Sequence, residues 1–280
     1  MLRLTVLLAL VSLAPAMDET FRAYWYDQGA EITRYQLDQA RYGEQRQGDA
    51  VLIFVTEPLA TTTAVKSDNP RAADAVPGLK LNHTRSFVTG VYPYHCLVTV
   101  LQPIAAGGPH ALKVSTSVQE WCGHVFEQFT PQGENWRYQL HSYFQSEGEQ
   151  DRPIPRVWLE DELWTRLRID PASLPSGEIQ LVPGALTRRF KHLPAAAHTA
   201  TVKRTVTGDQ ATLSIRYADI PRELHISHQA AFPYAIESWT EHMGQAVTTA
   251  RKTHRSFGPY WQWNGTAAES RRTDLGLPPP

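Results

Sequence analysis

The stretches STSVQEWCGHVFEQ, residues 115–128, and NWRYQLHSYFQ, residues 135–145, decide the fold of this chain. Both are rich in Val, Thr, Phe, Trp and Tyr, the residue types that fit a pleated surface. The residues TPQGEN at 130–135 join them. Their Pro restricts φ and their Gly accepts a positive φ, which is turn chemistry. We therefore predict that the two stretches are antiparallel strands of one hairpin at the centre of a sheet.

Side-chain alternation predicts a polar set on one face of this hairpin. Glu120, Cys122 and His124 are spaced two apart, so in a strand they point to the same side. If Phe129 pairs with Trp136, the register brings His141 opposite His124 and Tyr143 opposite Cys122. A slip of one residue would put Ser142 opposite His124 instead. The candidate site on this face consists of Glu120, Cys122, His124, His141 and Tyr143.

Three interpretations of this face stay open. Cys122 could act as a nucleophile, with His124 or His141 as its base, if the thiol ionises. The same three side chains could bind zinc, since thiolates and imidazoles are its usual ligands. The third interpretation is a packed polar face with no chemistry, and we rank it first. No other cofactor is indicated.

The chain contains two cysteines, Cys96 and Cys122. In an oxidising compartment such a pair invites a disulfide. A turn near residues 105–109, with pairing centred near Pro109, would place the two cysteines opposite each other. The alternative is two separate buried thiols.

The N-terminal residues, MLRLTVLLALVSLAPA, are typical of a secretory signal peptide that is cleaved after Ala16. The apolar run is too short to span a bilayer, and no later segment reaches the ~20 apolar residues that a spanning helix needs. We therefore expect an exported protein, periplasmic or secreted, with no membrane span. The predicted domains are the signal peptide at 1–16, a single β-rich domain at 17–270 and a disordered tail at 271–280.

Composition excludes several classes of protein. Arg3 is the only charged residue in the leader, which leaves 26 basic and 28 acidic residues in the mature chain. This balance argues against a nucleic-acid partner, which would require a basic stripe. The sequence has no G-x-x-x-x-G-K-[ST], G-x-G-x-x-G, H-E-x-x-H or G-x-S-x-G motif. These absences disfavour nucleotide, dinucleotide, zincin and α/β-hydrolase sites.

The rest of the chain predicts mainly strands and one helix. Leu159, Leu163, Trp164 and Leu167 form an apolar stripe at helical spacing, so we predict a helix over 157–169. Residues 30–42 suit either a strand or a helix, and we place a turn at 48–49. The predicted strands are 50–57, 79–88, 94–101, 178–182, 186–192, 199–207, 211–218, 222–228, 235–241 and 247–255. The fold class is therefore mainly β: a single large, strongly curved antiparallel sheet or open barrel with one covering helix.

Several strings in the chain resemble an uncharacterised family of exported bacterial proteins, many of them lipoproteins. They are YWYDQGAEITRYQLDQARYGE, AVLIFVTEP, LKLNHTRSFVTGVYPY, SVQEWCGHVF, HSYFQSEGE, LEDELW and FPYAIESWTE. Some members are labelled septum formation inhibitor Maf, but this chain lacks the SPRR-type motif of the Maf nucleotide pyrophosphatases. The resemblance implies export and a common fold, and no activity. The leader is followed by no lipid-attachment cysteine, so the chain departs from the lipoprotein members.

These observations predict an envelope-associated protein that binds an apolar ligand, such as a lipid, or an envelope-protein partner. The first alternative is a metal-dependent or cysteine-based enzyme centred on Cys122, His124 and His141, which we favour less. The second alternative is a purely structural envelope protein. A pocket lined by apolar side chains would favour the binding protein. Three ligands that converge on one point would favour the metal enzyme.

Overall fold

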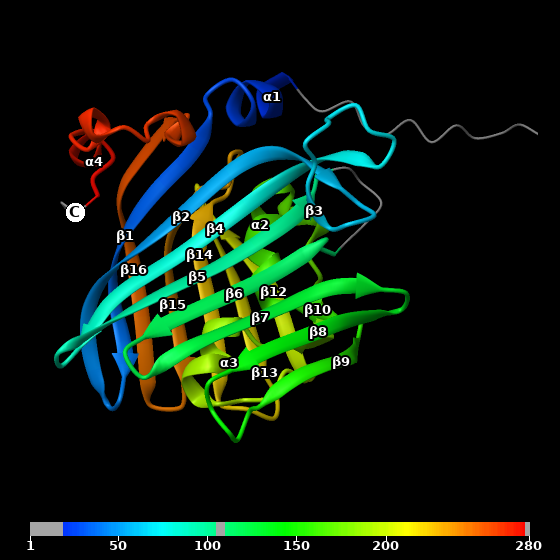
Figure 1. Ribbon diagram of the computed structural model, residues 1–280, viewed down its shortest axis with the longest axis vertical. Coiled ribbons are helices and arrows are strands. Elements are labelled where there is room, and N and C mark those ends of the chain that lie inside the picture. The colour runs from blue at the N-terminus through cyan, green and yellow to red at the C-terminus, as the bar shows by residue number, and fades with distance from the viewer. Residues whose placement is uncertain (1–18, 105–109, 278–280) are drawn as a thin grey trace, which may run out of the picture.

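The computed structural model describes residues 19–104 and 110–277, and most of them belong to one open sheet (Figure 1). The strands are β1 (Ala30–Arg41), β2 (Glu44–Ala60), β3 (Val65–Lys66), β4 (Ala75–Thr89), β5 (Tyr92–Pro103), β6 (Lys113–Glu120), β7 (Gly123–Gln132), β8 (Asn135–Ser142), β9 (Glu149–Pro155), β10 (Trp158–Leu159), β11 (Gly177–Val182), β12 (His198–Thr207), β13 (Gln210–Tyr217), β14 (Arg222–Gln229), β15 (Ile236–Met243) and β16 (Ala246–Gly258). The helices are α1 (Glu19–Trp25), α2 (Glu160–Ile169), α3 (Ala185–Lys191) and α4 (Arg271–Asp274), with short 3-10 turns at Pro171–Ser173, Tyr260–Gln262 and Thr266–Ala268.

The sheet has 16 strands in the order β10-β11-β12-β13-β14-β15-β16-β1-β2-β4-β5-β6-β7-β8-β9, with β3 paired to β2. Strand β1 lies in the middle, between β16 and β2, so the two halves of the chain meet there. All pairs are antiparallel except β10–β11, which is parallel. The edge strands β9 and β10 do not pair with each other, so the sheet stays open. The predicted fold class, a single large β sheet, is confirmed.

The sheet curves around α2 and α3, which lie on its concave side (Figure 1). One face of each long strand is apolar, and these faces form a single core that also includes both helices. The predicted helical stripe is correct, because Leu159, Leu163, Trp164 and Leu167 are all buried. The helix begins at Glu160 and not at 157, since Trp158 and Leu159 pair with β11.

The stretch 115–128 is two strands and not one, which corrects the predicted hairpin. Strand β6 ends at Glu120, and Trp121 and Cys122 form a two-residue turn before β7 begins at Gly123. A Cβ on Gly123 would lie 2.5 Å from Tyr143 Cγ, so a larger residue here would have to displace the Tyr143 ring. The predicted pairing of β7 with β8 is displaced by two residues, since Phe129 pairs with Tyr138 and not with Trp136.

The predicted disulfide does not form. Cys96 is buried on β5 opposite Val118, while Cys122 is exposed in the β6/β7 turn, and both thiols are free. The register of β5 with β6 keeps the two cysteines apart. The residue opposite Cys96 is Val118, which lies four residues before Cys122.

Two local predictions are also corrected. Residues 186–192 were predicted as a strand, but Leu186 and Phe190 lie on the buried side of helix α3. The first hairpin turns at Tyr42 and Gly43, both with positive φ, and not at 48–49. Gly48 lies within β2 at a close approach of strands, because a Cβ there would be 2.3 Å from the Ser86 carbonyl oxygen.

The described residues include part of the predicted C-terminal tail and none of the predicted signal peptide. Of the predicted tail at 271–280, the structure describes residues 271–277: Arg271–Asp274 form α4, and Leu275 is buried with Ile32 and Val55. The predicted signal peptide at 1–16 lies outside the described residues. Within them, no helix has the length and apolar character needed to cross a membrane.

Candidate functional site

The two histidines of the predicted site lie on the outer, convex face of the sheet. Val125 on β7 and Leu140 on β8 point inward, so His124 and His141 point outward. They are not directly opposite each other, because His124 pairs with Gln119 and His141 pairs with Phe126. His124 Nε2 is 3.0 Å from Ser117 Oγ, and His141 Nδ1 is 2.5 Å from Glu149 Oε2.

The remaining predicted site residues lie at or near two turns. The backbone N–H of Cys122 donates to Glu120 Oε2 at 2.6 Å, and Tyr143 is exposed after the end of β8. A hydrogen bond that the Cys122 thiol donates to the Glu120 carboxylate raises the pKa of this thiol, which works against a thiolate nucleophile. Within residues 19–104 and 110–277 no group of three or more His, Cys, Asp or Glu side chains could hold a metal ion. The predicted zinc cluster is therefore not assembled.

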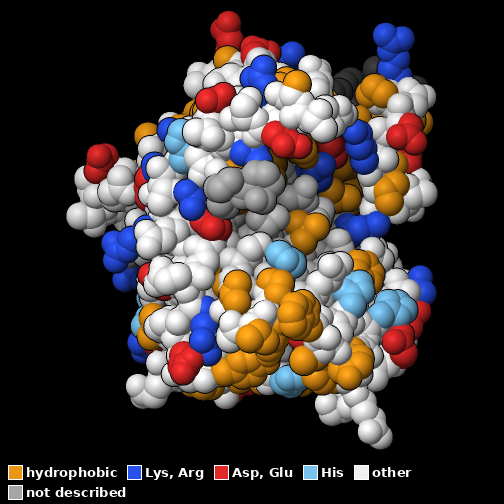
Figure 2. All heavy atoms as spheres, turned by 60° about the vertical axis from the view of Figure 1, so that its left-hand side comes forward, with side chains coloured by type: hydrophobic (Ala, Val, Ile, Leu, Met, Phe, Trp, Pro, Cys, Tyr) orange, Lys and Arg blue, Asp and Glu red, His pale blue; other side chains and the backbone are white. Residues whose placement is uncertain are grey.

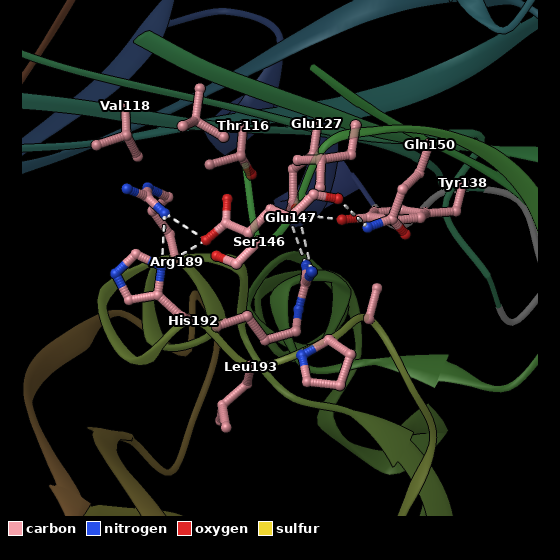
Figure 3. Close-up of a pocket in the computed structure, with 15 residues that line it drawn as sticks. Thr116, Val118, Glu127, Tyr138, Ser146, Glu147, Gln150, Arg189, His192 and Leu193 are labelled. Atoms are coloured by element: carbon pink, nitrogen blue, oxygen red, sulfur yellow. Dashed lines mark hydrogen bonds and ion pairs between the residues drawn. The ribbon is translucent and has the colours of Figure 1, made fainter. Parts of the chain in front are cut away.

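The structure reveals a different candidate, a cavity of about 200 Å³ between the inner face of β6–β9 and helix α3 (Figure 3). Side chains from the sheet form one wall, and the end of α3 with residues 192–195 forms the other. The lining residues are Thr116, Val118, Val125, Glu127, Tyr138, Leu140, Ser146, Glu147, Gln150, Arg188, Arg189, His192, Leu193, Pro194 and Ala195. None of them belongs to the predicted site.

A buried ion pair holds α3 on the sheet at one side of the cavity. Arg188 donates from Nη1 to Glu127 Oε2 at 2.8 Å and from Nη2 to Glu127 Oε1 at 2.5 Å. Tyr138 donates its hydroxyl to the same carboxylate at 3.0 Å. Burial, and then the charge of Glu127, raise the pKa of Tyr138, so this phenol stays a donor. The charges of Arg188 and Glu127 thus satisfy each other.

A second ion pair lies at the other side of the cavity. Glu147, from the loop between β8 and β9, accepts from Arg189 at 2.7 Å and from Ser142 at 2.5 Å. His192 Nδ1 is 2.6 Å from the same carboxylate, and Figure 3 shows Arg189 and His192 directed toward Glu147. His192 is the C-cap of α3 in the left-handed conformation, so the end of the helix positions it. This wall of the cavity is polar, and its carboxylate, Glu147, is also paired.

The rest of the lining combines apolar side chains with the polar Thr116, Ser146 and Gln150. Val118, Val125 and Leu140 project from neighbouring strands into the space. Beside them the buried hydroxyl of Thr116 has no hydrogen-bond partner in the part of the chain that the structure describes. A buried hydroxyl without a partner costs about 1–3 kcal/mol. The cavity therefore offers an occupant an apolar wall and, at Thr116, a buried hydroxyl without a partner.

The sequence pattern does not predict this cavity, because it predicts a strand for the segment that forms α3. One signal was present: Glu127 alternates with Val125 and Phe129, so a carboxylate shares the apolar face of β7. A carboxylate on a buried face requires a cationic partner. The partner is Arg188, 61 residues further along the chain, and its position is set only by the packing of α3.

No family model and no curated protein matches the sequence of this chain. A solved structure does resemble it: a beta-barrel-like protein of the domain of unknown function DUF1849, from Brucella abortus. The TM-score is 0.51 at 10% sequence identity, and the match covers 82% of this chain and 98% of that chain. At this identity the likeness concerns the fold alone, and it agrees with the resemblance to an uncharacterised family.

Proposed function

We propose that this protein is an exported, envelope-associated binding protein that holds a small amphipathic ligand in the cavity beside α3. The observation that carries the proposal is the cavity wall itself, which combines three apolar side chains with the unpartnered hydroxyl of Thr116. Covering apolar surface is favourable in water. A ligand that also hydrogen-bonds to Thr116 would remove the cost of the unsatisfied hydroxyl.

The size and charge of the cavity limit the ligand. A volume of about 200 Å³ is below the ~300–1,000 Å³ of pockets for drug-sized molecules. The cavity therefore suits a small molecule or one end of a longer one, such as the end of a lipid chain. Arg188 and Arg189 are already paired with Glu127 and Glu147. A ligand with an apolar body and an uncharged hydroxyl or amide group fits better than a strongly charged one.

Export rests on the N-terminal apolar run with its small residues before Met17. N-terminal sequencing of the protein from its own host should begin at Met17. A chain that begins at Met1 would contradict export by cleavage of this leader.

Native mass spectrometry of protein purified from its host tests the binding function. We expect an added mass of a small apolar molecule that is lost on mild activation. A fluorescent apolar probe should then bind the emptied protein, and Val125→Phe, which fills the cavity, should weaken probe binding about tenfold, equivalent to ~1.4 kcal/mol. His124→Phe is the matched control, because it lies next to Val125 on β7 and points outward.

Two results would contradict the proposal. One is a wild-type protein that carries no molecule and binds no probe, which would leave the structural envelope role. The other is equal probe binding by Val125→Phe and wild type, which would place any bound probe outside this cavity. Circular dichroism of both variants shows whether each is folded.

A further inference from the structure

The most exposed apolar side chains of the described residues gather at one end of the sheet. Val91 is 80% exposed, Trp121 72%, Tyr143 64% and Tyr42 59%, the four highest values for large hydrophobic residues. They lie at the β4/β5, β6/β7, β8/β9 and β1/β2 connections. In an antiparallel meander, alternate turns fall at the same end of the sheet, and these four connections do so in Figure 1. We name this surface the aromatic rim: Tyr42, Val88, Val91, Tyr92, Trp121 and Tyr143.

The aromatic rim is continuous from one turn to the next. The hydroxyls of Tyr42 and Tyr94 are 2.8 Å apart, and the ring centroids of Tyr94 and Tyr92 are 5.8 Å apart. Tyr92 stacks on Trp121 with 6.3 Å between centroids. Tyr143 lies against the backbone of Gly123, just after the Trp121 turn. Figure 2 shows hydrophobic side chains with histidines among them at the lower end of the molecule, where these turns lie.

Two cations without acidic partners adjoin this rim. The Arg41 guanidinium lies 4.1 Å from the centre of the Tyr42 ring and donates to the Phe190 carbonyl oxygen at 2.7 Å. Among the described residues neither Arg41 nor the exposed Lys191 forms an ion pair with a carboxylate. Both line an open hollow of about 420 Å³, in which the one carboxylate, Glu44, is paired with Arg46. At the Tyr42 turn this end of the sheet thus combines exposed apolar tips with two cations that lack acidic partners, while Glu120 beside Trp121 has no basic partner among the described residues.

We infer that the aromatic rim docks on the surface of a membrane that contains anionic lipids. Trp and Tyr are favoured at membrane interfaces, where one part of the side chain is in apolar surroundings and the other in water. Lys and Arg beside such a surface are attracted by anionic headgroups. Four separate turns provide apolar tips that could enter the interface side by side, while Arg41 and Lys191 meet the headgroups.

The rim is also next to the cavity. Tyr143 contacts Phe144 with 5.3 Å between ring centroids, and Phe144 contacts His192, which lines the cavity, at 5.1 Å. Docking through the rim would therefore bring the cavity close to the lipid. The docking itself does not require the cavity to hold a ligand, so it can be tested separately from the proposed binding function.

Co-sedimentation with large vesicles tests the inference. The wild-type protein should bind vesicles of equimolar phosphatidylglycerol and phosphatidylcholine, and bind more weakly when salt is raised or phosphatidylglycerol is omitted. Val91→Ser with Trp121→Ser should lower the partition coefficient at least about tenfold, since two apolar side chains no longer enter the interface. Lys191→Gln should lower it about fivefold. All variants share one N-terminus, so any effect of residues 1–16 cancels.

Val206→Ser with Trp261→Ala is the matched control. These side chains are also exposed, but Val206 precedes the β12/β13 turn at the opposite end of the sheet and Trp261 follows β16. The control should bind vesicles as the wild type does. Equal binding by the rim variant, or no wild-type binding to anionic vesicles, would overturn the inference. So would self-association that depends on Trp121 without vesicle binding, since the rim would then be a protein interface.

Discussion

Helices α2 and α3 both lie inside the curved sheet and both are held by buried ion pairs, yet their surroundings differ. Arg168 of α2 donates to Glu31 of β1 at 2.7 and 2.6 Å, and Glu160 of α2 accepts from Arg222 of β14 at 2.9 Å. The hollow beside Trp164 of α2, which Leu186 and Thr187 of α3 also line, is only about 10 Å³, against about 200 Å³ between α3 and β6–β9.

The difference shows that a buried ion pair positions a helix on the inner face of the sheet but does not fill the space around it. Arg188 fixes the position of α3 through Glu127, but it does not fill the space around the helix. On α2 the ion pairs are joined by the apolar stripe of Leu163, Trp164 and Leu167, which does fill it. The charged pairs position both helices, and apolar packing decides whether a cavity remains. We expect α2 to carry stability and α3 to carry binding.

The largest expected effect is the loss of the α2 ion pair. Arg168→Met leaves Glu31 buried without its cation, and breaking a buried pair costs about 3–5 kcal/mol. Urea denaturation measures the free energy of unfolding. The exposed pair of Arg137 with Asp151 is the control, because Arg137→Ala should leave the free energy of unfolding nearly unchanged. Similar losses in the two variants would refute a special role of burial.

A second prediction compares the apolar packing of the two regions. Leu163→Ala in α2 creates a cavity in a filled core and should cost about 2–5 kcal/mol. Leu193→Ala enlarges a cavity that already exists and loses less buried surface, so it should cost about 1 kcal/mol. Denaturation of both variants in urea measures the difference. A loss at Leu193 as large as that at Leu163 would remove the contrast between the regions.

The smallest expected effect concerns the contact between the two helices. Asp161 of α2 accepts from the N–H of Ala185, the first residue of α3, at 2.9 Å. Burial, followed by the charge of Glu160, raises the pKa of Asp161 to about 7. An acid whose pKa is raised by folding favours the folded state while protonated. Its contribution to stability therefore falls as the pH rises from about 4, near the unfolded pKa, to about 7.

Asp161→Asn keeps an acceptor for Ala185 and cannot ionise. Relative to the wild type it should change stability little at about pH 4, and stabilise the protein at about pH 8. His83 acts in the opposite sense, because burial lowers its pKa, but it is present in both proteins and cancels in the difference. Urea midpoints at the two pH values measure the effect. A difference that does not change with pH would show that Asp161 is ionised throughout.

The amino-acid sequence predicted the strands well where alternation was strong. The predicted strands 199–207, 211–218 and 222–228 correspond to β12, β13 and β14 within a residue or two. Register was harder to predict, and the reason is geometric. A slip of one residue exposes the apolar face, but a slip of two keeps every side chain on its own face. Pattern alone could therefore not separate the pairing of Phe129 with Trp136 from the observed pairing with Tyr138.

The candidate site likewise depends partly on local sequence and partly on tertiary packing. By itself the sequence determined which side chains are apolar, where glycines permit turns, and that the α2 segment has a helical stripe, because these are local properties. Leu186 and Phe190, four apart, suit both a strand and a helix, so only packing against the sheet decided that α3 is a helix. The tertiary structure alone brought Arg188 to Glu127, left the cavity beside them, and set the exposed tips of four distant turns at one end of the sheet. Each of these depends on contacts between residues far apart in the chain, which no local pattern specifies.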